Sequence, residues 1–557
     1  MKLLDPRGLL QRSCLQLARR PDRAALAGKP LLFYDNAKMD VGHYGLIFGR
    51  IKAGLRANGI TRFTDYRESI RGKSNADILS LAESLSGKAV CAAVLGLADM
   101  GVSPAMVTLT VALERLGIPA VCVTAGPGTE LCKAHASYRA GSLCLCDLDL
   151  HPGSSREEVE READAAIARI VAMLGADGAA LEALSRIDYP LDRSPVMSDG
   201  YLSIDEAPGH DDLDAVFEHF AALHIGDGLP FVPPTLPRYE RMRRYCAFDP
   251  NEVLIEGVGP SGTPIRIKDV IVSSVMAGCK PEYLPLVLTA VRAISRPRYN
   301  LLQAVTTSHG GGHFLVASGP LAAEIGMHGG QGCLGPGFRA NASIGRAVNL
   351  VLSNVCRSVP GFADLACLSS PAEYSFCMAE PTPTDAWRGI NEEHFGRGDT
   401  CVLALMAESP HSIMDLASTT AEGLMETIID CCTTLGSNNA FVPGALVLVL
   451  NPDHARMLRE GGYDKDRIRC EVHAAARVER ARLNSRGLVS IPNADEDAGR
   501  FRHVTRAPAD VEVVVAGGRG GHSAVILPWA LHSDPVYEGV RLPNGKLAAR
   551  LDEFLQR

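Results

Sequence analysis

Short apolar runs alternate with segments of helical periodicity along the first third of the chain. Residues 30–36, PLLFYDN, are apolar at successive positions, which is typical of a strand buried on both faces of a sheet. In the segment that follows, apolar residues recur with helical spacing up to Gly59. This alternation predicts a parallel sheet with helices on both faces. The expected strands are 30–36, 61–66, 88–96, 118–126 and 142–146, and the expected helices are 43–59, 75–86, 103–117, 128–138 and 155–174.

Proline, glycine and acidic residues interrupt the pattern between residues 185 and 230. We therefore predict a doubly wound, flavodoxin- or Rossmann-like α/β domain over 1–184, a linker over 185–230 that contains a helix at 213–223, and a larger C-terminal α/β domain over 231–557. The expected C-terminal strands are near 300–306, 313–317, 401–407, 444–450 and 511–516. The expected helices are near 235–246, 268–277, 282–295, 342–356, 412–433, 452–460, 464–485 and 541–557.

Composition narrows the class of protein without naming a function. The chain has 557 residues, 46% of them hydrophobic and 22% charged, as in ordinary globular proteins. Its net charge of −8 argues against nucleic-acid and anionic-membrane partners, and no apolar run is long enough to predict a membrane span. Sixteen cysteines without a CxxC pair, and no secretory signal, predict a cytoplasmic protein with free thiols. A homo-oligomer is compatible with this size.

The N-terminal domain offers a first candidate site. In open parallel sheets ligands bind beyond the carboxyl ends of the strands, where this sequence places Asn36, Lys38 and Ser103. If Ser103 caps the helix that starts there, its N-terminus would suit an anionic group; alternatively, Ser103 is only a cap. The glycine turn GPGTE lacks the Lys-Ser/Thr ending of a P-loop, and no GxGxxG follows the first strand, so a dinucleotide fingerprint is not supported and the cofactor stays unknown.

Cysteine provides the candidate nucleophiles of the C-terminal region. The stretch VMAGCKPEY places Cys279, Lys280 and Glu282 in a turn between two apolar helices. A thiol beside an ammonium group and a helix N-terminus tends to have a lowered pKa, which would make Cys279 nucleophilic. The alternative is a core cysteine beside a surface ion pair. The stretch SPAEYSFCMAEP adds a second thiol, Cys377, beside a candidate general acid or base, Glu380.

Glycine-rich stretches accompany arginine. The stretch GMHGGQGCLGPGFRANASIGRA brings Arg339, Asn341 and Arg346 to the start of a predicted helix, a combination that suits a carboxylate or phosphate. The alternative is a structural loop with paired arginines. The stretch VEVVVAGGRGGHS offers a second anion-binding turn with three more candidate side chains, or else only a hairpin corner. Those side chains are Arg519, His522 and Ser523.

The stretch SHGGGHF raises a metal alternative. His309 and His313 could bind a metal ion with His328 and Cys333 as further ligands. The HxxxH spacing suits a metal when it lies on a helix, but three glycines separate this pair, so no helix is expected. We therefore assign no metal site from the sequence.

The chain resembles a known family. The segments LLDP (3–6), LAGKPLLFYDNAKMD (26–40) and GLADMGVSPAMVTLTVALERLGIPAV (96–121) resemble the UGSC-like domain of selenoproteins and their cysteine homologues. That family carries G-D-U-G-S-C where this chain has Met100-Gly101-Val102-Ser103, so the reactive residue is missing here. The family's redox role therefore cannot be transferred to these positions.

The C-terminal region resembles the companion module of the same family. Six segments of this region resemble motifs of that module. They are residues 227–235, 276–283, 335–347, 374–380, 452–456 and 517–523, and the corresponding family motifs are DGLPVVPPT, MAGCKPEY, GPGNRANATIGRA, KYSFCFAEN, PEHAR and GGPGxHS. The polar residues shared through this resemblance are Cys279, Lys280, Glu282, Arg339, Asn341, Arg346, Cys377, Glu380 and His522.

These patterns lead to three hypotheses. The first is an enzyme that acts on a small anionic organic molecule by cysteine-thiolate chemistry, either bond cleavage or formation or a thiol-based reduction, in a pocket lined by glycine and arginine. In that hypothesis the first domain helps to shape the pocket or binds a partner. The second is a non-catalytic protein that binds a small acid and has lost its redox motif. The third is a metal-dependent enzyme that uses His309 and His313.

Overall fold

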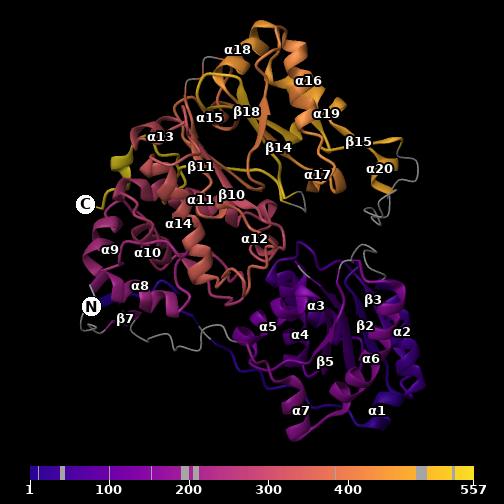
Figure 1. Ribbon diagram of the computed structural model, residues 1–557. Coiled ribbons are helices and arrows are strands. Elements are labelled where there is room, and N and C mark those ends of the chain that lie inside the picture. The colour runs from indigo at the N-terminus through magenta and orange to yellow at the C-terminus, as the bar shows by residue number, and fades with distance from the viewer. Residues whose placement is uncertain are drawn as a thin grey trace.

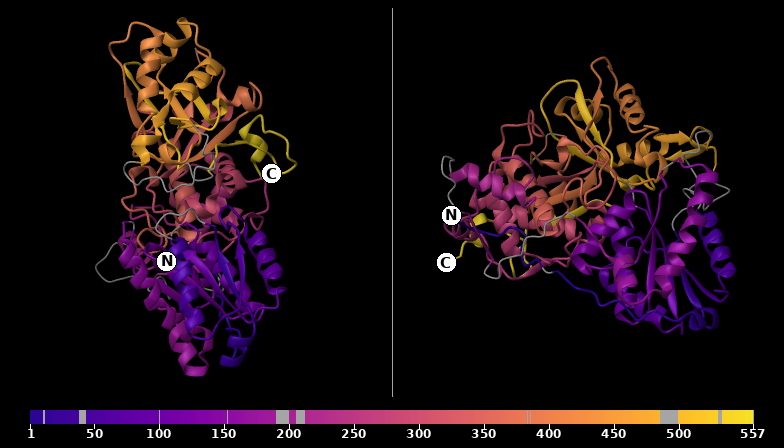
Figure 2. Two further views of the ribbon diagram at one scale, coloured as in Figure 1. Left: turned by 90° about the vertical axis from the view of Figure 1, so that its right-hand side faces the viewer. Right: turned by 60° about the horizontal axis from the view of Figure 1, so that its bottom comes forward.

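The structure is a computed structural model in which two α/β regions form two lobes (Figures 1 and 2). The smaller lobe contains most of the N-terminal third, and the larger contains the rest of the chain. The residues that the structure describes are 1–10, 12–37, 44–99, 101–151, 153–189, 200–204, 212–382, 384, 386–484, 499–529 and 533–556.

The N-terminal lobe is built on a parallel sheet of five strands. Their order across the sheet is β3-β2-β4-β5-β6, which is the flavodoxin-type order with its reversal point between β2 and β4. The doubly wound fold predicted from the sequence is therefore confirmed. The strands are β2 (Leu31–Asp35), β3 (Phe63–Arg67), β4 (Ala92–Ala98), β5 (Ala120–Ala125) and β6 (Leu145–Leu148).

Helices cover both faces of this sheet because its strands are apolar at successive positions. Leu31 and Phe33 pack with α2 and α6, whereas Leu32 and Tyr34 pack with α3 and α4 on the opposite face. The helices of this lobe are α1 (Arg23–Gly28), α2 (Tyr44–Ala57), α3 (Asn75–Ser86), α4 (Ser103–Arg115), α5 (Pro127–Arg139), α6 (Arg156–Gly175) and α7 (Gly178–Ser185).

The C-terminal lobe contains two four-stranded mixed sheets. Each has one parallel pair at an edge followed by two antiparallel neighbours. The first sheet has the order β11 (Cys377–Glu380), β10 (Gly312–Ser318), β12 (Cys401–Ala407) and β19 (Val536–Gly539). The second has the order β17 (Val511–Val515), β14 (Leu446–Leu450), β18 (His522–Ile526) and β13 (His411–Met414).

The two sheets pack face to face between two layers of helices. Phe314 and Val316 of β10 share an apolar core with Val447 and Val449 of β14, so the inner faces meet. The outer face of the first sheet packs against α10 (Ile267–Met276), α11 (Leu284–Ser295) and α14 (Arg339–Val355). The outer face of the second packs against α16 (Ala421–Cys431), α18 (Pro452–Glu460) and α19 (Lys465–Ala475).

The sheets exchange one strand each. The chain leaves β12 in the first sheet and continues directly into β13, the edge strand of the second. It later leaves β18 in the second sheet and continues into β19, the edge strand of the first. The two halves of this lobe are therefore interlocked.

The segment predicted as a linker divides between the lobes: residues 185–189 pack with the N-terminal lobe, and the described residues from 200 onward contribute to the C-terminal lobe. Strand β7 (Tyr201–Ser203) pairs antiparallel with β1 (Lys2–Leu4), and α8 (Asp212–Ala222) buries Val216 and Phe220 in the core that contains α10 and α11. The predicted helix at 213–223 is confirmed.

Four predicted elements differ from the structure. Residues 300–306 form helix α12 (Leu301–Ala304) after Asn300 rather than a strand. The predicted helix at 412–433 is divided into β13 and α16, because the Asp415 carboxylate accepts hydrogen bonds from the Ala417 and Ser418 amides and makes a turn between them. The helix at 464–485 is interrupted by β15 (Arg477–Glu479), and 541–557 contains only the 3₁₀ turn η5 (Leu551–Phe554).

The other elements connect these layers. The strands are β8 (Val253–Ile255), β9 (Ile265–Arg266) and β16 (Phe501–His503). The helices are α9 (Leu236–Arg243), α13 (Pro320–Glu324), α15 (Ile390–His394), α17 (Asn438–Phe441), α20 (Arg480–Asn484), η1 (Pro281–Tyr283), η2 (Pro297–Tyr299), η3 (Pro371–Glu373) and η4 (Pro508–Asp510).

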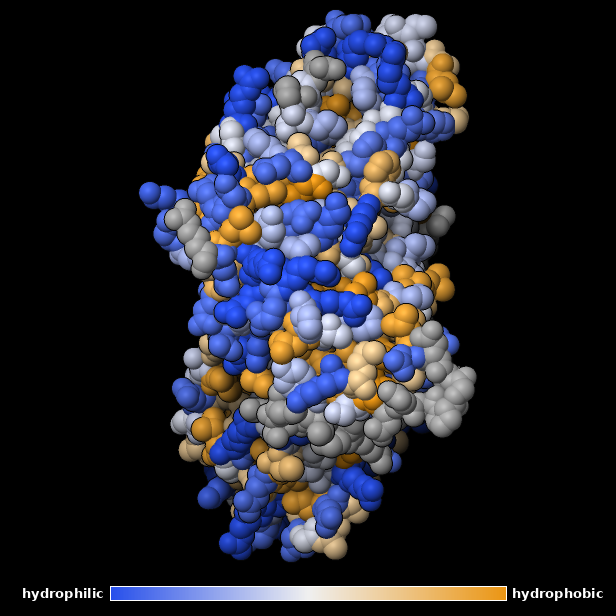
Figure 3. Space-filling model, turned by 90° about the vertical axis from the view of Figure 1, so that its left-hand side faces the viewer, coloured by the Kyte–Doolittle hydropathy of each residue, from blue (hydrophilic) through white to orange (hydrophobic). Residues whose placement is uncertain are grey.

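Three features predicted from the composition can be examined in the structure: membrane-spanning helices, the hydropathy of the surface and the state of the cysteines. Within the described part of the chain, no helix is both long and apolar enough to cross a bilayer. On the face shown in Figure 3, hydrophobic patches alternate with hydrophilic ones. All sixteen cysteines are free thiols, as predicted.

Candidate active site

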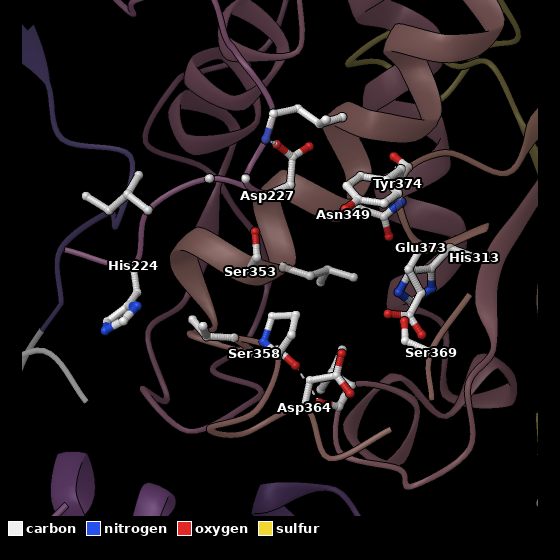
Figure 4. Close-up of a pocket in the computed structure, with 18 of the residues that line it drawn as sticks. His224, Asp227, His313, Asn349, Ser353, Ser358, Asp364, Ser369, Glu373 and Tyr374 are labelled. Carbon is white, nitrogen blue, oxygen red and sulfur yellow. Dashed lines mark hydrogen bonds between the residues drawn. The ribbon is translucent and has the colours of Figure 1, made fainter. Parts of the chain in front are cut away.

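The C-terminal lobe contains a cavity of about 690 Å³ at the N-terminal end of β10. Helix α8, the loop after it, the second half of α14 and the segment 358–374 form its walls. Figure 4 shows His313, Glu373 and Ser369 on one side of this cavity and His224 on the opposite side. Its volume is in the range of small-molecule sites.

Three successive glycines bring the polar wall of the cavity together. A Cβ atom on Gly310 would lie 2.9 Å from the Cα of Ser369, and one on Gly312 would lie 2.7 Å from the carbonyl oxygen of Ala372. Only glycine therefore allows the start of β10 to lie against the segment that carries Glu373. Two of the three glycines that separate His309 and His313 therefore contact this segment.

Glu373 ends the short helix η3 and is half-buried in the cavity wall. Burial raises the pKa of Glu373 to about 7, and Asp364 adds to the rise, whereas a hydrogen bond from Ser369 and the nearby His309 oppose it. At neutral pH this carboxyl group therefore exists in both protonation states. That property is expected of a group that accepts and donates protons in a reaction.

His309 is held by a carboxylate. Its Nε2 lies 3.1 Å from Oε1 of Glu408, an acceptor, so the Nε2 proton is directed at Glu408. Its Nδ1 is buried and has no hydrogen-bond partner among the described residues. A histidine oriented in this way has a free lone pair, as is required of a general base.

His313, the second residue of β10, points to the same cavity. Its side chain is only 8% exposed, and its Nδ1 is hydrogen bonded to the hydroxyl group of the fully buried Tyr299. Burial lowers the pKa of His313 to about 4, so its ring is neutral at physiological pH.

The cavity lining is acidic and partly apolar. Among the described residues, its lining includes the carboxyl groups of Glu218, Asp364 and Glu373, as well as Asp227, which pairs with Arg346, but no lysine or arginine. The aromatic rings of Phe217 and Phe231, whose centroids are 5.0 Å apart, belong to another part of the lining. Such a cavity favours a neutral or cationic ligand with an apolar part over an anion.

The N-terminal lobe supports one wall of the cavity. Val359 and Asp364 line it, while Phe362 and Ala363 between them pack with Tyr138 and Tyr189 of the first lobe. The hydroxyl group of Tyr189 also donates a hydrogen bond to the carbonyl oxygen of Phe362. The first lobe therefore contacts the segment that forms this wall.

The two predicted nucleophiles lie together in the apolar core. The Sγ of Cys279 donates a hydrogen bond of 3.3 Å to the carbonyl oxygen of Ser343, and Cys377 begins β11 against Gly345 of α14. Burial raises the pKa of Cys279 to about 12, and burial followed by the neighbouring Cys279 raises the pKa of Cys377 to about 12. The prediction of a lowered pKa for Cys279 is therefore wrong, because burial outweighs the nearby arginines Arg339 and Arg346.

The predicted anion-binding residues at α14 hold the chain instead. Arg346 binds Asp227 with two hydrogen bonds of 2.7 and 2.8 Å and donates two more to the carbonyl groups of Leu229 and Pro230. Arg339 donates to the carbonyl oxygen of Gly278, and Asn341 is hydrogen bonded to the backbone of the glycine loop at His328 and Cys333. These bonds use the side chains of Arg346 and Asn341, whereas Arg339 is exposed and bonded to the described residues only through Nε.

The other residues predicted beside the thiols are not gathered around them. Lys280 and Glu282 are partly exposed and 3.9 Å apart. Glu380 is buried, and its carboxylate accepts hydrogen bonds from Ser318 and from the Ile390 amide, at 2.9 and 2.7 Å. Burial raises the pKa of Glu380, which these bonds and Lys465 oppose.

The second predicted turn contacts the glycine loop but has its own partners. The Gly517 amide donates to the carbonyl oxygen of Gly329, and the exposed Arg519 pairs with Asp453 at 3.1 Å. The Oγ of Ser523 lies 2.8 Å from Nδ1 of the buried His454. The ring of His522 is exposed at the start of β18.

At the N-terminal edge the predicted residues are buried or undescribed. Asn36 donates through Nδ2 to the carbonyl oxygen of Leu97 at 2.7 Å, which joins the ends of β2 and β4. Ser103 is the first residue of α4 rather than its cap, because Val102 occupies the cap position, and its hydroxyl group is buried without a partner among the described residues. Lys38 and Met100 lie outside the described residues.

The histidines of the metal hypothesis have other partners. His309 contacts Glu408, His313 contacts Tyr299, and His328 stacks on Phe338. In the described ranges, the three side chains whose donor atoms are close enough for a metal ion are Glu393, His394 and Glu512. Lys465 and Arg469 each pair with Glu393 at 2.8 Å, so that cluster is already neutralised.

Sequence reasoning missed Glu373, Tyr299 and Glu408. Glu373 belongs to the stretch SPAEYSFCMAEP, which was selected for Cys377 and Glu380 instead. The turn that begins at Pro371 and places a carboxyl group just before an apolar strand could have indicated Glu373. The sequence does not show, however, that this turn packs against Gly310 and Gly312.

The chain was also compared with known proteins. Protein-family models, curated proteins and solved structures all yielded no match, so the resemblance to the UGSC-like family stays a prediction.

Proposed function

We propose that this protein is an enzyme that transfers protons to and from a small molecule in the cavity at the N-terminal end of β10. Glu373 is the main proton carrier and His309, oriented by Glu408, is the second. The observation that carries this proposal is a carboxyl group with a pKa of about 7 in the wall of a 690 Å³ cavity. A group with a pKa near the working pH is the most efficient general acid or base.

The two proton-transferring residues, Glu373 and His309, have different surroundings. The pKa of Glu373 is raised by burial and by Asp364 and is opposed by a hydrogen bond from Ser369 and by the nearby His309. His309 is held by geometry, since Glu408 binds its Nε2, and its buried Nδ1 has no hydrogen-bond partner among the described residues.

The ligand of this cavity is a neutral or cationic molecule with an apolar portion. The absence of lysine and arginine from its described lining makes an anion a poor ligand there. This proposal therefore departs from the anionic substrate expected from the sequence. Thiolate chemistry at Cys279 and Cys377 stays a prediction, and it requires a substrate to reach sulfur atoms that are less than 8% exposed as whole residues.

Dicyclohexylcarbodiimide provides a direct test, because it reacts with protonated carboxyl groups in apolar surroundings. We expect it to label Glu373 at pH 6 and much less at pH 8.5, as mapped by peptide mass spectrometry. The exposed Glu324 at the end of α13 is the internal control and is expected to stay unlabelled. Absence of label on Glu373 at pH 6 would contradict the proposed protonation state.

Turnover provides the second test. A panel of small neutral and cationic ketones, esters and amines is incubated with the protein in D₂O, and NMR records products and deuterium incorporation. For any compound that is converted, Glu373→Gln is expected to lower the rate by about 10²- to 10⁴-fold. Glu324→Gln is the matched control and is expected to leave the rate unchanged. Conversion by Glu373→Gln at the wild-type rate, or a panel that is left unchanged by the wild type, argues against the proposal.

A further inference from the structure

We infer that the substrate of this cavity is a carbonyl compound and that the Nε2–H of His313 binds its carbonyl oxygen while Glu373 removes a proton from the adjacent carbon. This inference rests on the proposed function, which supplies the base. It adds the class of substrate and a further catalytic residue, His313, neither of which follows from proton transfer alone.

The tautomer of His313 is set by Tyr299. The Tyr299 side chain is fully buried, and its hydroxyl group has His313 Nδ1 as its hydrogen-bond partner among the described residues. A buried hydroxyl proton needs an acceptor, so the phenol donates to Nδ1 and the imidazole proton resides on Nε2. The two rings stack with centroids 5.8 Å apart, which fixes the orientation of the imidazole.

The Nε2–H group is the free end of His313. Its side chain lines the cavity, is more than nine-tenths buried, and forms no other hydrogen bond with the described residues. Nε2 does not belong to the fully buried atoms without a partner, so its N–H group is accessible to a carbonyl oxygen in the cavity. Because burial keeps the pKa of His313 at about 4, the ring donates this bond as a neutral group.

Glu373 and His313 are placed to act on one molecule. Gly312 lies against Ala372, as shown by the 2.7 Å between a Cβ built on Gly312 and the carbonyl oxygen of Ala372. His313 follows Gly312 in the sequence, and Glu373 follows Ala372. Figure 4 shows both side chains on the same side of the cavity. A carbonyl group bound to His313 therefore has its neighbouring carbon near the carboxylate.

The chemical step is an enolisation. The Glu373 carboxylate takes the proton from the carbon next to the carbonyl group, and the electron pair of that C–H bond forms a C=C bond. The π electrons of the carbonyl group move to its oxygen, where Nε2–H of His313 stabilises the charge without losing its proton. Return of the proton to the same carbon or to a neighbouring one completes exchange, racemisation or isomerisation, and no oxidant or reductant is needed.

The rest of the cavity selects the remainder of the substrate. The rings of Phe217 and Phe231, together with Leu352, supply apolar surface away from the polar wall. An aryl or alkyl ketone places its carbonyl group at His313 and its apolar part against these side chains. Acetophenone labelled with ¹³C at the carbonyl carbon is therefore a suitable probe.

The experiment measures binding and exchange separately. We expect wild-type protein to lower the C=O stretching frequency of bound acetophenone and to exchange its methyl hydrogens in D₂O. His313→Leu is expected to abolish the frequency shift and to slow exchange by about 10²- to 10³-fold, whereas His313→Gln, which keeps an N–H donor, restores part of both. Glu373→Gln is expected to retain the frequency shift and lose exchange.

These outcomes separate this inference from the proposed function. If His313→Leu exchanges as fast as wild type while Glu373→Gln is inactive, the base is retained and the role of His313 is refuted. The absence of a frequency shift in the wild type refutes carbonyl binding whatever Glu373 does. ¹⁵N NMR of His313 adds an independent readout of the tautomer. A neutral ring protonated at Nε2 from pH 5 to 8 in the wild type, and a mixture of tautomers in Tyr299→Phe, support the assigned tautomer. An imidazolium ion at pH 7 overturns it.

Discussion

The pKa of Glu373 makes the stability of the C-terminal lobe depend on pH. Burial raises this pKa from its ordinary value near 4.5 to about 7. Between these two values the folded protein holds a proton that the unfolded chain has lost, so the free energy of unfolding falls as pH rises toward 7. Glu373→Gln removes the cost of burying the charge. We therefore expect this variant to be more stable than wild type at pH 8 and equal to it near pH 4.5.

The magnitude follows from the shift and from the exposure of the side chain. A difference of one pKa unit corresponds to about 1.4 kcal/mol, so the full shift would be worth about 3 kcal/mol. Glu373 is only half-buried, and solvent screens part of the cost, so we expect about half of that value, ~1.5 kcal/mol at pH 8.

Urea denaturation of wild type and Glu373→Gln at several pH values between 4.5 and 8 measures this difference. The transition of the C-terminal lobe is followed by hydrogen exchange of peptides from β10 and β12, because the two lobes need not unfold together. Glu324→Gln controls for loss of an exposed carboxylate. A pH-independent gap between wild type and Glu373→Gln, or no gap at pH 8, refutes the reasoning.

Three further predictions concern the predicted site residues and the N-terminal lobe. Iodoacetamide is expected to alkylate the exposed thiols of the native protein, which are Cys14, Cys367 and Cys470, and to leave the buried Cys279 and Cys377 unmodified. Mass spectrometry measures the modification, and fast alkylation of Cys279 would contradict its burial. Arg346→Ala is expected to lower the free energy of unfolding by about 3 kcal/mol, and the double variant with Asp227→Ala by less than the sum of the two single changes, because the partners share two hydrogen bonds. Gly128→Ala is expected to cost about 1–3 kcal/mol in urea denaturation, since its Cβ would lie 2.5 Å from the Asp99 backbone; a smaller loss would show that α5 shifts freely.

Local patterns predicted many elements well. The helix at 75–86 has the predicted bounds because Ser74 and Asp77 form a capping box, and the helix at 452–460 begins where the Asn451 side chain caps it. The strand at 401–407 also matches, since its residues are apolar throughout. Each of these signals is complete within a few residues of sequence.

The site was not accessible to the same reasoning. The sequence analysis selected the right two stretches, SHGGGHF and SPAEYSFCMAEP, but neither shows that Gly310 and Gly312 pack against Ser369 and Ala372. Similarly, the arginine pattern at α14 suggested an anion because the partner of Arg346, Asp227, is 119 residues away in sequence. A perturbed pKa is produced by burial and by such distant neighbours, so it cannot be derived from spacing.

The exchange of strands between the two sheets has a consequence for biosynthesis. Strand β12 has both of its neighbours, β10 and β19, only after residues 536–539 have left the ribosome, long after β10 itself. Until then a nascent chain presents an unpaired β12 edge that other polypeptides could join. We therefore expect the larger lobe to complete its folding after translation of β19, and the cavity at the end of β10 and β12 to form together with that last step.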